Sequence, residues 1–439
     1  MNFKNKFMSW WKVSGHLEIK NNKLFISGMA VESLAEKYGT PLFVINATRI
    51  KEKYELLHNS FQKQLGKIDI HYAMKANSTP AVLKLLEKLG SCIDAVSPFE
   101  VLLAEKVGFS KDRVLFTGTS VSDEDMNKIA GKTRMNMDSK SQIKRYAKLV
   151  KEKGFSPEVS IRINPGKGAG HVPECITAGE DAKFGIPERE TLEAYKLALD
   201  LGLKPIGIHM HVGSQILKQD IHVFYNASKR ILDLAGEIKK KLGIDFEFID
   251  LGGGIGIPYK AGDVPVDIPE FSKTVSDIVK AKSKEYDINF NLKIEPGRFL
   301  VGDSTVLLIK VVDVNDKYVP ELGVNAGFNV FYRPAMYKTY HEIVNATNVD
   351  SEAKKKYRVS GNLCESGDVF TENKHSLREL PVTREGDVLA IMNAGAYGST
   401  MSSNYNLRPR AREIMILNGK VEIVKEKESF ENLIRSFKA

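Results

Sequence analysis

Short apolar runs rich in β-branched residues alternate with helical stretches along the chain between Thr48 and Gly302. The helical pattern, with apolar residues three and four positions apart, is clearest in 49–64, 80–89, 140–153, 188–201 and 224–242. Eight apolar runs are predicted to be strands: 68–75, 91–96, 113–118, 134–138, 158–164, 206–213, 246–253 and 291–298. Such alternation is typical of a parallel sheet covered by helices.

The number of strand–helix units indicates which kind of parallel sheet this is. Eight units over roughly 230 residues match the size of a (β/α)8 TIM-type barrel. An open doubly wound sheet is the alternative, but no obvious dinucleotide-binding fingerprint accompanies these strands. We therefore predict a (β/α)8 barrel over residues 48–304.

The pattern changes after Gly302, where strand-like runs follow one another with few long helical patterns between them. These runs are 306–314, 329–332, 357–361, 388–392 and 413–417, and 17–27 and 41–45 near the N-terminus are of the same kind. We predict a β-rich domain built from both chain ends, residues 1–47 and 305–439.

Bulk properties favour a protein of the cytoplasm. The net charge of +9 comes from lysines mixed with glutamates along helical stretches, so we expect a solvated surface and no nucleic-acid partner. The three cysteines, Cys92, Cys175 and Cys364, are widely spaced, which argues against a zinc site or a disulfide framework. No apolar run has the roughly 18 residues of a membrane span, so we expect no membrane association.

Chemically distinctive residues fall near the ends of the predicted barrel strands, where barrels carry their active sites. They are a lysine, two carboxylates, a histidine, a glycine run and an arginine: Lys75, Asp94, His211, Gly252–Gly254, Glu295 and Arg298. Stability alone does not readily explain such a set. We expect these side chains to converge on one face of the barrel.

Lys75 and a histidine pair each allow a functional and a structural interpretation. Burial lowers the pKa of a lysine and makes it a candidate Schiff-base former, whereas a lone lysine at a strand end more often emerges into solvent. His209 and His211 share a face of their strand. The two histidines could bind a metal, but the sequence positions no third ligand beside them. The remaining interpretations are an imidazole packed on an aromatic cofactor and a structural histidine, and the structural role suits mainly His209.

The glycine run and the EPGR segment are each weak signals taken singly. Glycines at 252–254 permit close approach to a phosphate, but a tight turn needs them too. Glu295 could keep a ring nitrogen protonated, or simply pair with Arg298. Cys364 and Glu365 lie outside the barrel, where a thiol beside carboxylates could transfer protons or be a small buried side chain beside loop charges.

In this order, the motifs YAMKAN, HVGSQ, GGG, EPGR, CESGD and GAYG resemble the decarboxylases of the alanine-racemase-like fold that depend on pyridoxal 5'-phosphate (PLP). RPAMY and SSNYN narrow the resemblance to the diaminopimelate decarboxylase family. It covers about residues 35–417. The chain departs from the usual family pattern at SPFE (97–100) and in the segment 170–185, which leaves the PLP motifs intact.

The resemblance implies a homodimer with shared active sites, a small amino-acid substrate and no metal. Lys75 would carry PLP as a Schiff base, supported by Asp94, with His211 stacked on the ring and Glu295 at the pyridine nitrogen. Ser214, Gly252, Gly253, Gly254 and Tyr397 would hold the phosphate. The substrate-binding residues would be Arg298, Arg333, Tyr337, Tyr397 and, from the partner subunit, Glu365. Cys364, also from the partner subunit, would help protonate the reaction intermediate.

Two arginines favour a substrate that keeps a carboxylate after decarboxylation, because guanidinium groups bind carboxylates in a bidentate manner. In the resembled family that substrate is meso-2,6-diaminopimelate, converted to L-lysine and CO2 in the last step of lysine biosynthesis. The alternatives are a decarboxylase of the same fold acting on a siderophore precursor, a polyamine precursor or a D-amino acid, a racemase, and a PLP-binding protein without catalysis. A racemase would be expected to lack CESGD.

Overall fold

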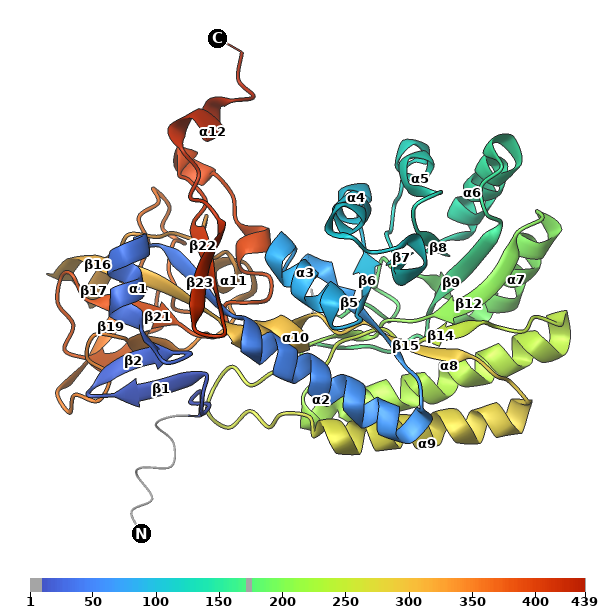
Figure 1. Ribbon diagram of the computed structural model, residues 1–439, viewed down its shortest axis with the longest axis horizontal. Helices are drawn as coiled ribbons and strands as arrows, with labels where there is room; N and C mark the ends of the chain where they lie inside the picture. The colour runs from blue at the N-terminus through green and yellow to red at the C-terminus, as the bar shows by residue number, and fades with distance from the viewer. Residues whose placement is uncertain (1–9, 171–175, 439) are drawn as a thin grey trace. The chain divides into compact units, whose positions relative to one another are not determined.

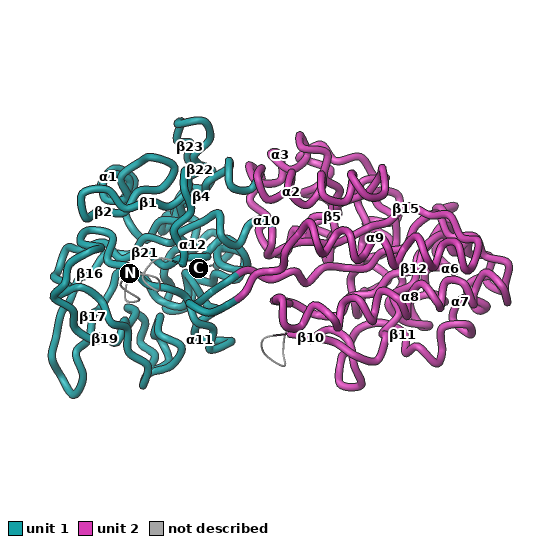
Figure 2. Tube along the Cα trace, turned by 90° about the horizontal axis from the view of Figure 1, so that it is seen from below, with its two compact units in different colours: residues 1–50, 258–263, 300–439 teal, residues 51–257, 264–299 magenta. Residues whose placement is uncertain are grey.

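The computed structural model describes residues 10–170 and 176–438. It divides into two compact units, coloured in Figure 2: residues 51–257 with 264–299, and residues 1–50 with 258–263 and 300–439. Part of the variant segment 170–185, including Cys175, lies outside the described residues. None of the helices in the described ranges combines the length and hydropathy that a membrane span requires.

The first unit is a closed parallel barrel, as the sequence predicts. Each barrel strand pairs in parallel with its neighbours, and β8 pairs with β9 to complete the ring. The eight strands are β5 (Asp69–Ala73), β6 (Cys92–Ala95), β7 (Val114–Phe116), β8 (Arg134–Met137), β9 (Glu158–Asn164), β12 (Lys204–His209), β14 (Phe248–Asp250) and β15 (Asn291–Ile294). All eight predicted strands are thereby confirmed.

Helices connect the barrel strands and lie outside them (Figure 1). They are α2 (Ala47–Leu65), α3 (Pro80–Lys88), α4 (Pro98–Val107), α5 (Asp123–Ile129), α6 (Lys140–Lys153), α7 (Thr191–Asp200), α8 (Ile221–Leu242) and α9 (Ile268–Tyr286). Helix α6 has the same bounds as the helix predicted over 140–153, and its capping residues explain why. The Ser139 side chain caps its first turn by accepting from the backbone N–H of Gln142, and Gly154 ends it in a left-handed conformation.

Three short strands and a short helix complete this unit near the carboxyl ends of the barrel strands. Strand β10 (Ala169–Gly170) pairs with β13 (Gly213–Ser214), and β11 (Ile186–Pro187) extends the pairing of β9. Helix α10 (Arg298–Val301) begins at Arg298 and continues into the second unit.

The second unit is β-rich and uses both chain ends. Strand β4 (Leu42–Asn46) pairs with β16 (Thr305–Asp316) on one side and β22 (Arg412–Leu417) on the other. Its remaining strands are β1 (Leu17–Lys20), β2 (Lys23–Ile26), β3 (Met29–Ala30), β17 (Pro320–Val324), β18 (Ile343–Asn345), β19 (Lys354–Ser360), β20 (Arg378–Pro381), β21 (Val388–Ile391) and β23 (Lys420–Lys425). Its short helices are α1 (Val31–Tyr38), α11 (Arg333–Tyr337) and α12 (Phe430–Ile434).

Two predictions for the β-rich unit need correction. Residues 329–332 form a turn, in which the backbone N–H groups of Val330 and Phe331 both donate to the carbonyl of Gly327. Their apolar side chains are buried without strand pairing. The single strand predicted over 17–27 is a hairpin, because Asn21 and Asn22 adopt φ angles of 50° and 61° and reverse the chain.

Candidate active site

Three neighbouring barrel strands bring Lys75, Asp94 and Glu295 to the same end of the barrel. Strand β5 pairs with β15 on one side and with β6 on the other. Lys75 lies in the turn directly after β5, Asp94 lies on β6, and Glu295 directly follows β15. The sequence therefore predicts the strand ends correctly, and the order of strands in the ring places these three side chains on adjacent positions.

Lys75 is held by Asp94. The Lys75 Nζ atom lies 3.1 Å from Asp94 Oδ2, and the Asp94 side chain is fully buried whereas that of Lys75 is 35% exposed. The other Asp94 oxygen accepts a hydrogen bond from the Thr117 hydroxyl, on the loop after the next strand. Lys75 therefore presents a partly accessible amine at this end of the barrel, which is the group that a Schiff base to a carbonyl compound requires.

Glu100, in the SPFE variant, adds a third carboxyl to this region. It accepts a hydrogen bond of 2.7 Å from the backbone N–H of Val96. Burial is the main cause that raises the pKa of Glu100 to about 7; the Val96 hydrogen bond and the charge of Lys75 lower this pKa, and the charge of Asp94 raises it. Sequence reasoning noted the segment 97–100 as a departure from the family pattern but did not predict the interaction of Glu100 with Lys75.

His209, Asp250 and Glu295 form a buried cluster across strands β12, β14 and β15. His209 Nε2 lies 3.1 Å from Glu295 Oε2, and one nitrogen or oxygen from each of the three side chains lies within 4.8 Å of the others. Burial raises the pKa of Glu295 well above its usual range, raises that of Asp250 to about 8 and lowers that of His209 to about 4. Histidine and carboxylate side chains also bind metals. Here, however, His209 Nε2 and Glu295 Oε2, each a possible ligand atom, are hydrogen-bonded to each other.

His211 is fixed by its own loop. Its Nδ1 atom accepts from the backbone N–H of Gly213 at 3.2 Å and lies 2.8 Å from the Thr177 hydroxyl. Burial, and after it the positive charge of Lys75, holds the pKa of His211 well below its usual value. The imidazole is therefore neutral.

The glycine run packs tightly against the EPGR segment. A Cβ atom on Gly253 would lie 1.9 Å from the backbone oxygen of Glu295, so no side chain fits there. The Gly252 carbonyl accepts from the backbone N–H of Glu295 at 2.9 Å. Nearby, Arg298 donates to the Ser214 hydroxyl at 3.2 Å, and Arg298 is buried. These contacts join two of the predicted phosphate-binding segments to Glu295 and Arg298.

The β-rich unit brings Arg333, Tyr337 and Tyr397 together. Arg333 begins helix α11, and its guanidinium carbon lies 5.8 Å from the centre of the Tyr337 ring and 5.9 Å from that of Tyr397. Arg333 is buried, and its Nε donates to His341 Nε2 at 3.3 Å. His341 Nδ1 donates in turn to the Met392 carbonyl at 2.9 Å. Sequence reasoning missed His341, which lies eight residues after Arg333.

Cys364 and Glu365 lie on an exposed loop of the same unit. The Cys364 backbone N–H donates to the Asn406 side chain at 2.7 Å, and Glu365 Oε1 accepts from the Gly367 backbone at 3.2 Å. The thiol and the carboxylate both remain exposed. The predicted residues thus form two groups, one in each unit.

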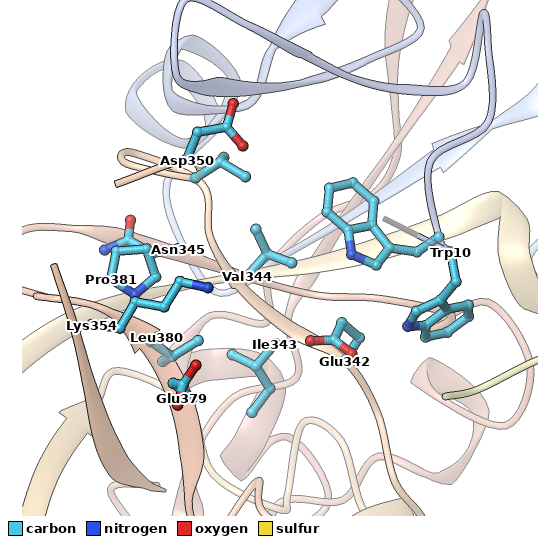
Figure 3. Close-up of a pocket in the computed structure, with 12 residues that line it drawn as sticks. Trp10, Glu342, Ile343, Val344, Asn345, Asp350, Lys354, Glu379, Leu380 and Pro381 are labelled. Atoms are coloured by element: carbon cyan, nitrogen blue, oxygen red, sulfur yellow. The ribbon is translucent and has the colours of Figure 1, made fainter. Parts of the chain in front are cut away.

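A separate cavity of about 190 Å³ lies in the β-rich unit (Figure 3). Two tryptophans and several charged side chains line it, among them Trp10, Glu342, Lys354 and Glu379. No residue of the predicted site is among the described residues that line this cavity. It therefore adds nothing to the candidate active site.

Comparison with known proteins agrees with this geometry. Residues 49–302 match the family model of the pyridoxal-dependent decarboxylases, pyridoxal binding domain. The diaminopimelate decarboxylase of Methanothermobacter thermautotrophicus is 45% identical over 414 residues, which cover 94% of this chain and 95% of that protein.

Solved structures give the same result over both units. The diaminopimelate decarboxylase of M. jannaschii in co-complex with L-lysine superposes with a TM-score of 0.87 at 34% identity, covering 97% of this chain and 98% of the other. That of Helicobacter pylori, complexed with L-lysine, gives 0.84 at 31% identity, covering 92% and 98%. The chain belongs to the diaminopimelate decarboxylase family of pyridoxal-dependent decarboxylases.

Proposed function

We propose that this protein is a PLP-dependent carboxy-lyase that converts meso-2,6-diaminopimelate to L-lysine and CO2. The observation that carries the proposal is the placement of Lys75, Asp94 and Glu295 at the ends of three neighbouring strands of the barrel. A reactive amine and a buried carboxylate on adjacent strands are what a pyridoxal enzyme requires. The high identity to named diaminopimelate decarboxylases supports the choice of reaction.

The residues of the barrel unit fit PLP. Lys75 offers an accessible amine, and Glu295 Oε1 is buried with no hydrogen-bond partner among the described residues, so it can accept from a pyridine nitrogen. His211 would lie against the ring, and Ser214 and Gly252–Gly254 would hold the phosphate, with Tyr397 of the β-rich unit as a further proposed phosphate ligand. PLP, when bound, supplies the electron sink that allows an amino acid to lose CO2.

Two buried arginines support a dicarboxylic substrate. Arg298 and Arg333 are each nearly inaccessible, and a buried guanidinium gains most from a carboxylate partner. We propose that they bind the substrate carboxylates, with Tyr337, Tyr397 and Glu365 completing recognition. Relatives whose structures contain L-lysine support this reading, because lysine is the product of the proposed reaction.

We further propose a homodimer in which Cys364 and Glu365 act in the partner's active site. Their loop is exposed and lies near a stack of aromatic rings, in which Phe328 lies 5.5 Å from both Tyr332 and Tyr405. Tyr405 and Leu407 are 44% and 49% exposed, which is a surface suited to burial against a second copy. Cys364 would donate a proton to the carbon atom from which CO2 has left.

We also propose a cytoplasmic location and no nucleic-acid partner. Among the described residues, Cys92 and Cys364 are free thiols, which suits a reducing compartment. Surface lysines pair with neighbouring carboxylates, such as Lys196 with Asp200 at 2.9 Å and Lys273 with Asp277 at 2.8 Å. Such pairing disperses positive charge instead of forming a basic patch.

The test is to purify the protein with PLP, add meso-diaminopimelate and quantify L-lysine against a Lys75→Ala control. Lysine formed by the wild type alone supports the reaction and the role of Lys75. PLP absorbance without lysine would keep the cofactor and move the substrate to the siderophore, polyamine or D-amino-acid alternatives. If the wild type forms no lysine and also shows no PLP absorbance, the proposal is overturned.

A further inference from the structure

We infer that His209 is a positioning residue: it holds one oxygen of Glu295 and leaves the other to meet the cofactor. The inference rests on the proposed role of Glu295. His209 ends strand β12, and its Nε2 lies 3.1 Å from Glu295 Oε2. Both side chains are buried, at 0% and 1% exposure, so water does not compete for this bond. The sequence alone favours a merely structural role for His209.

The hydrogen bond fixes which nitrogen of His209 carries the proton. When Glu295 is ionised, as a protonated pyridine nitrogen beside it would require, its oxygens only accept, so Nε2–H donates to Glu295 and Nδ1 is left unprotonated. Nδ1 is buried and has no hydrogen-bond partner among the described residues. An unpaired acceptor is tolerated better in a protein interior than an unpaired N–H, which agrees with this tautomer. Burial also lowers the pKa of His209 to about 4, so the ring is neutral.

Asp250 is a second buried carboxyl group close to Glu295, and it raises the free-energy cost of ionising Glu295. Asp250 aligns with His209 across β12 and β14, and its Oδ1 accepts from the Gly252 backbone at 2.9 Å. Its Oδ2 is buried without a partner among the described residues. Two carboxyl groups this close and this buried resist ionising together. A donor aimed at Glu295 therefore favours charge on Glu295, the carboxyl proposed to face the cofactor.

The arrangement gives each Glu295 oxygen a separate task. Oε2 accepts from His209, and Oε1 is buried with no partner among the described residues. A protonated pyridine nitrogen would supply the missing donor and the opposite charge. Without His209, the carboxylate would lose its fixed rotamer as well as one hydrogen bond.

The test compares three variants of the PLP-bound enzyme: His209→Leu, His209→Gln and His71→Leu. Leucine removes the donor, whereas glutamine retains an N–H near the position of Nε2. His71 is a matched control, a buried histidine on β5 whose ring contacts the carbonyl of Ile93 at 3.2 Å. The readouts are the PLP dissociation constant by equilibrium dialysis, kcat and KM, and the unfolding temperature.

His209→Leu should weaken PLP binding and lower kcat, each by about 10-fold or more, with KM nearly unchanged. His209→Gln should recover most of both, and His71→Leu should keep wild-type PLP affinity. Equal losses in His209→Leu and His71→Leu, or no recovery by glutamine in a folded variant, would overturn the inference. PLP affinity does not depend on the substrate, so a wild type that binds PLP but makes no lysine rejects only the proposed function.

Discussion

Lys75 and Asp94 form an ion pair of 3.1 Å between adjacent barrel strands, in which the carboxylate is fully buried and the amine is partly exposed. Asp94 cannot move to follow the amine, because its second oxygen is held by Thr117. The carboxylate is thus fully buried and held by two partners, whereas the Lys75 side chain remains partly exposed. Such a difference in burial suits a lysine whose amine must alternate between a bond to PLP and an ion pair with Asp94.

Replacing Asp94 should impair cofactor capture. We expect Asp94→Asn to weaken PLP binding about 10-fold, because a neutral amide holds the Lys75 amine less strongly than a carboxylate. Thr117→Val is the matched control, since it removes a hydrogen bond to Asp94 but keeps the charge, and its effect should be smaller. Equilibrium dialysis of PLP measures both variants. Wild-type affinity in Asp94→Asn would show that the ion pair does not prepare Lys75.

The PLP-free protein should lose stability as pH rises from about 6.5 to about 8. Burial raises the pKa of Asp250 to about 8 and that of Glu295 well above its usual range, so the folded state keeps protons that the unfolded state has released. The buried histidines have lowered pKa values, so their contribution falls below this window. Urea unfolding at both pH values measures the slope. Asp250→Asn should flatten it, and an unchanged slope would contradict the assignment.

His341 should control how Arg333 binds substrate. Because His341 Nε2 accepts from Arg333 Nε, His341→Gln retains an acceptor, whereas His341→Asn is too short to reach. We expect His341→Asn to raise KM for diaminopimelate about 10-fold with little change in PLP affinity, and His341→Gln to raise it less. Steady-state kinetics of the two variants measures KM for diaminopimelate. Similar KM values for both would show that the acceptor is unimportant.

Gly253→Ala should prevent correct assembly of the barrel end. The added Cβ would lie 1.9 Å from the backbone oxygen of Glu295, so strand β15 or the glycine run must shift. We expect destabilisation of about 3 kcal/mol or more and loss of PLP binding. Gly131→Ala is the control, because an added Cβ there would have no atom within 4 Å and the φ of Gly131 is not positive. Denaturant unfolding of the two variants would be compared, and equal stabilities would contradict the expectation.

Mixing two inactive variants tests the shared active site of the proposed homodimer. If Lys75 of one subunit works with Cys364 of the other, a heterodimer of Lys75→Ala and Cys364→Ala contains one intact site. Random exchange of subunits should then restore about one quarter of wild-type activity. If both residues act within one chain, mixing restores nothing. Activity after unfolding and refolding the two variants together, compared with each alone, distinguishes these cases.

Local pattern was sufficient for much of this fold. All eight barrel strands were predicted because each is a short run with apolar residues between helical or turn segments. Helix α6 was predicted to the residue because its capping residues are local. The turn at 329–332 was mistaken for a strand, because buried apolar residues look alike in sequence whether or not a partner strand is present. The hairpin at Asn21 and Asn22 was missed, although the polar residues 20–23 interrupt the apolar run there and asparagine tolerates positive φ angles.

The sequence by itself determined the alternation of strands and helices, the β-rich ends and the order of the motifs, since these depend on periodicity and residue type within a few positions. Only the tertiary structure decided which side chains share a hydrogen bond. His209 lies 86 residues from Glu295, and their contact follows from the order of β12, β14 and β15 in the ring. The same holds for Lys75 and Asp94. Strand pairing over long separations is set by the closure of the whole barrel, and no local pattern encodes it.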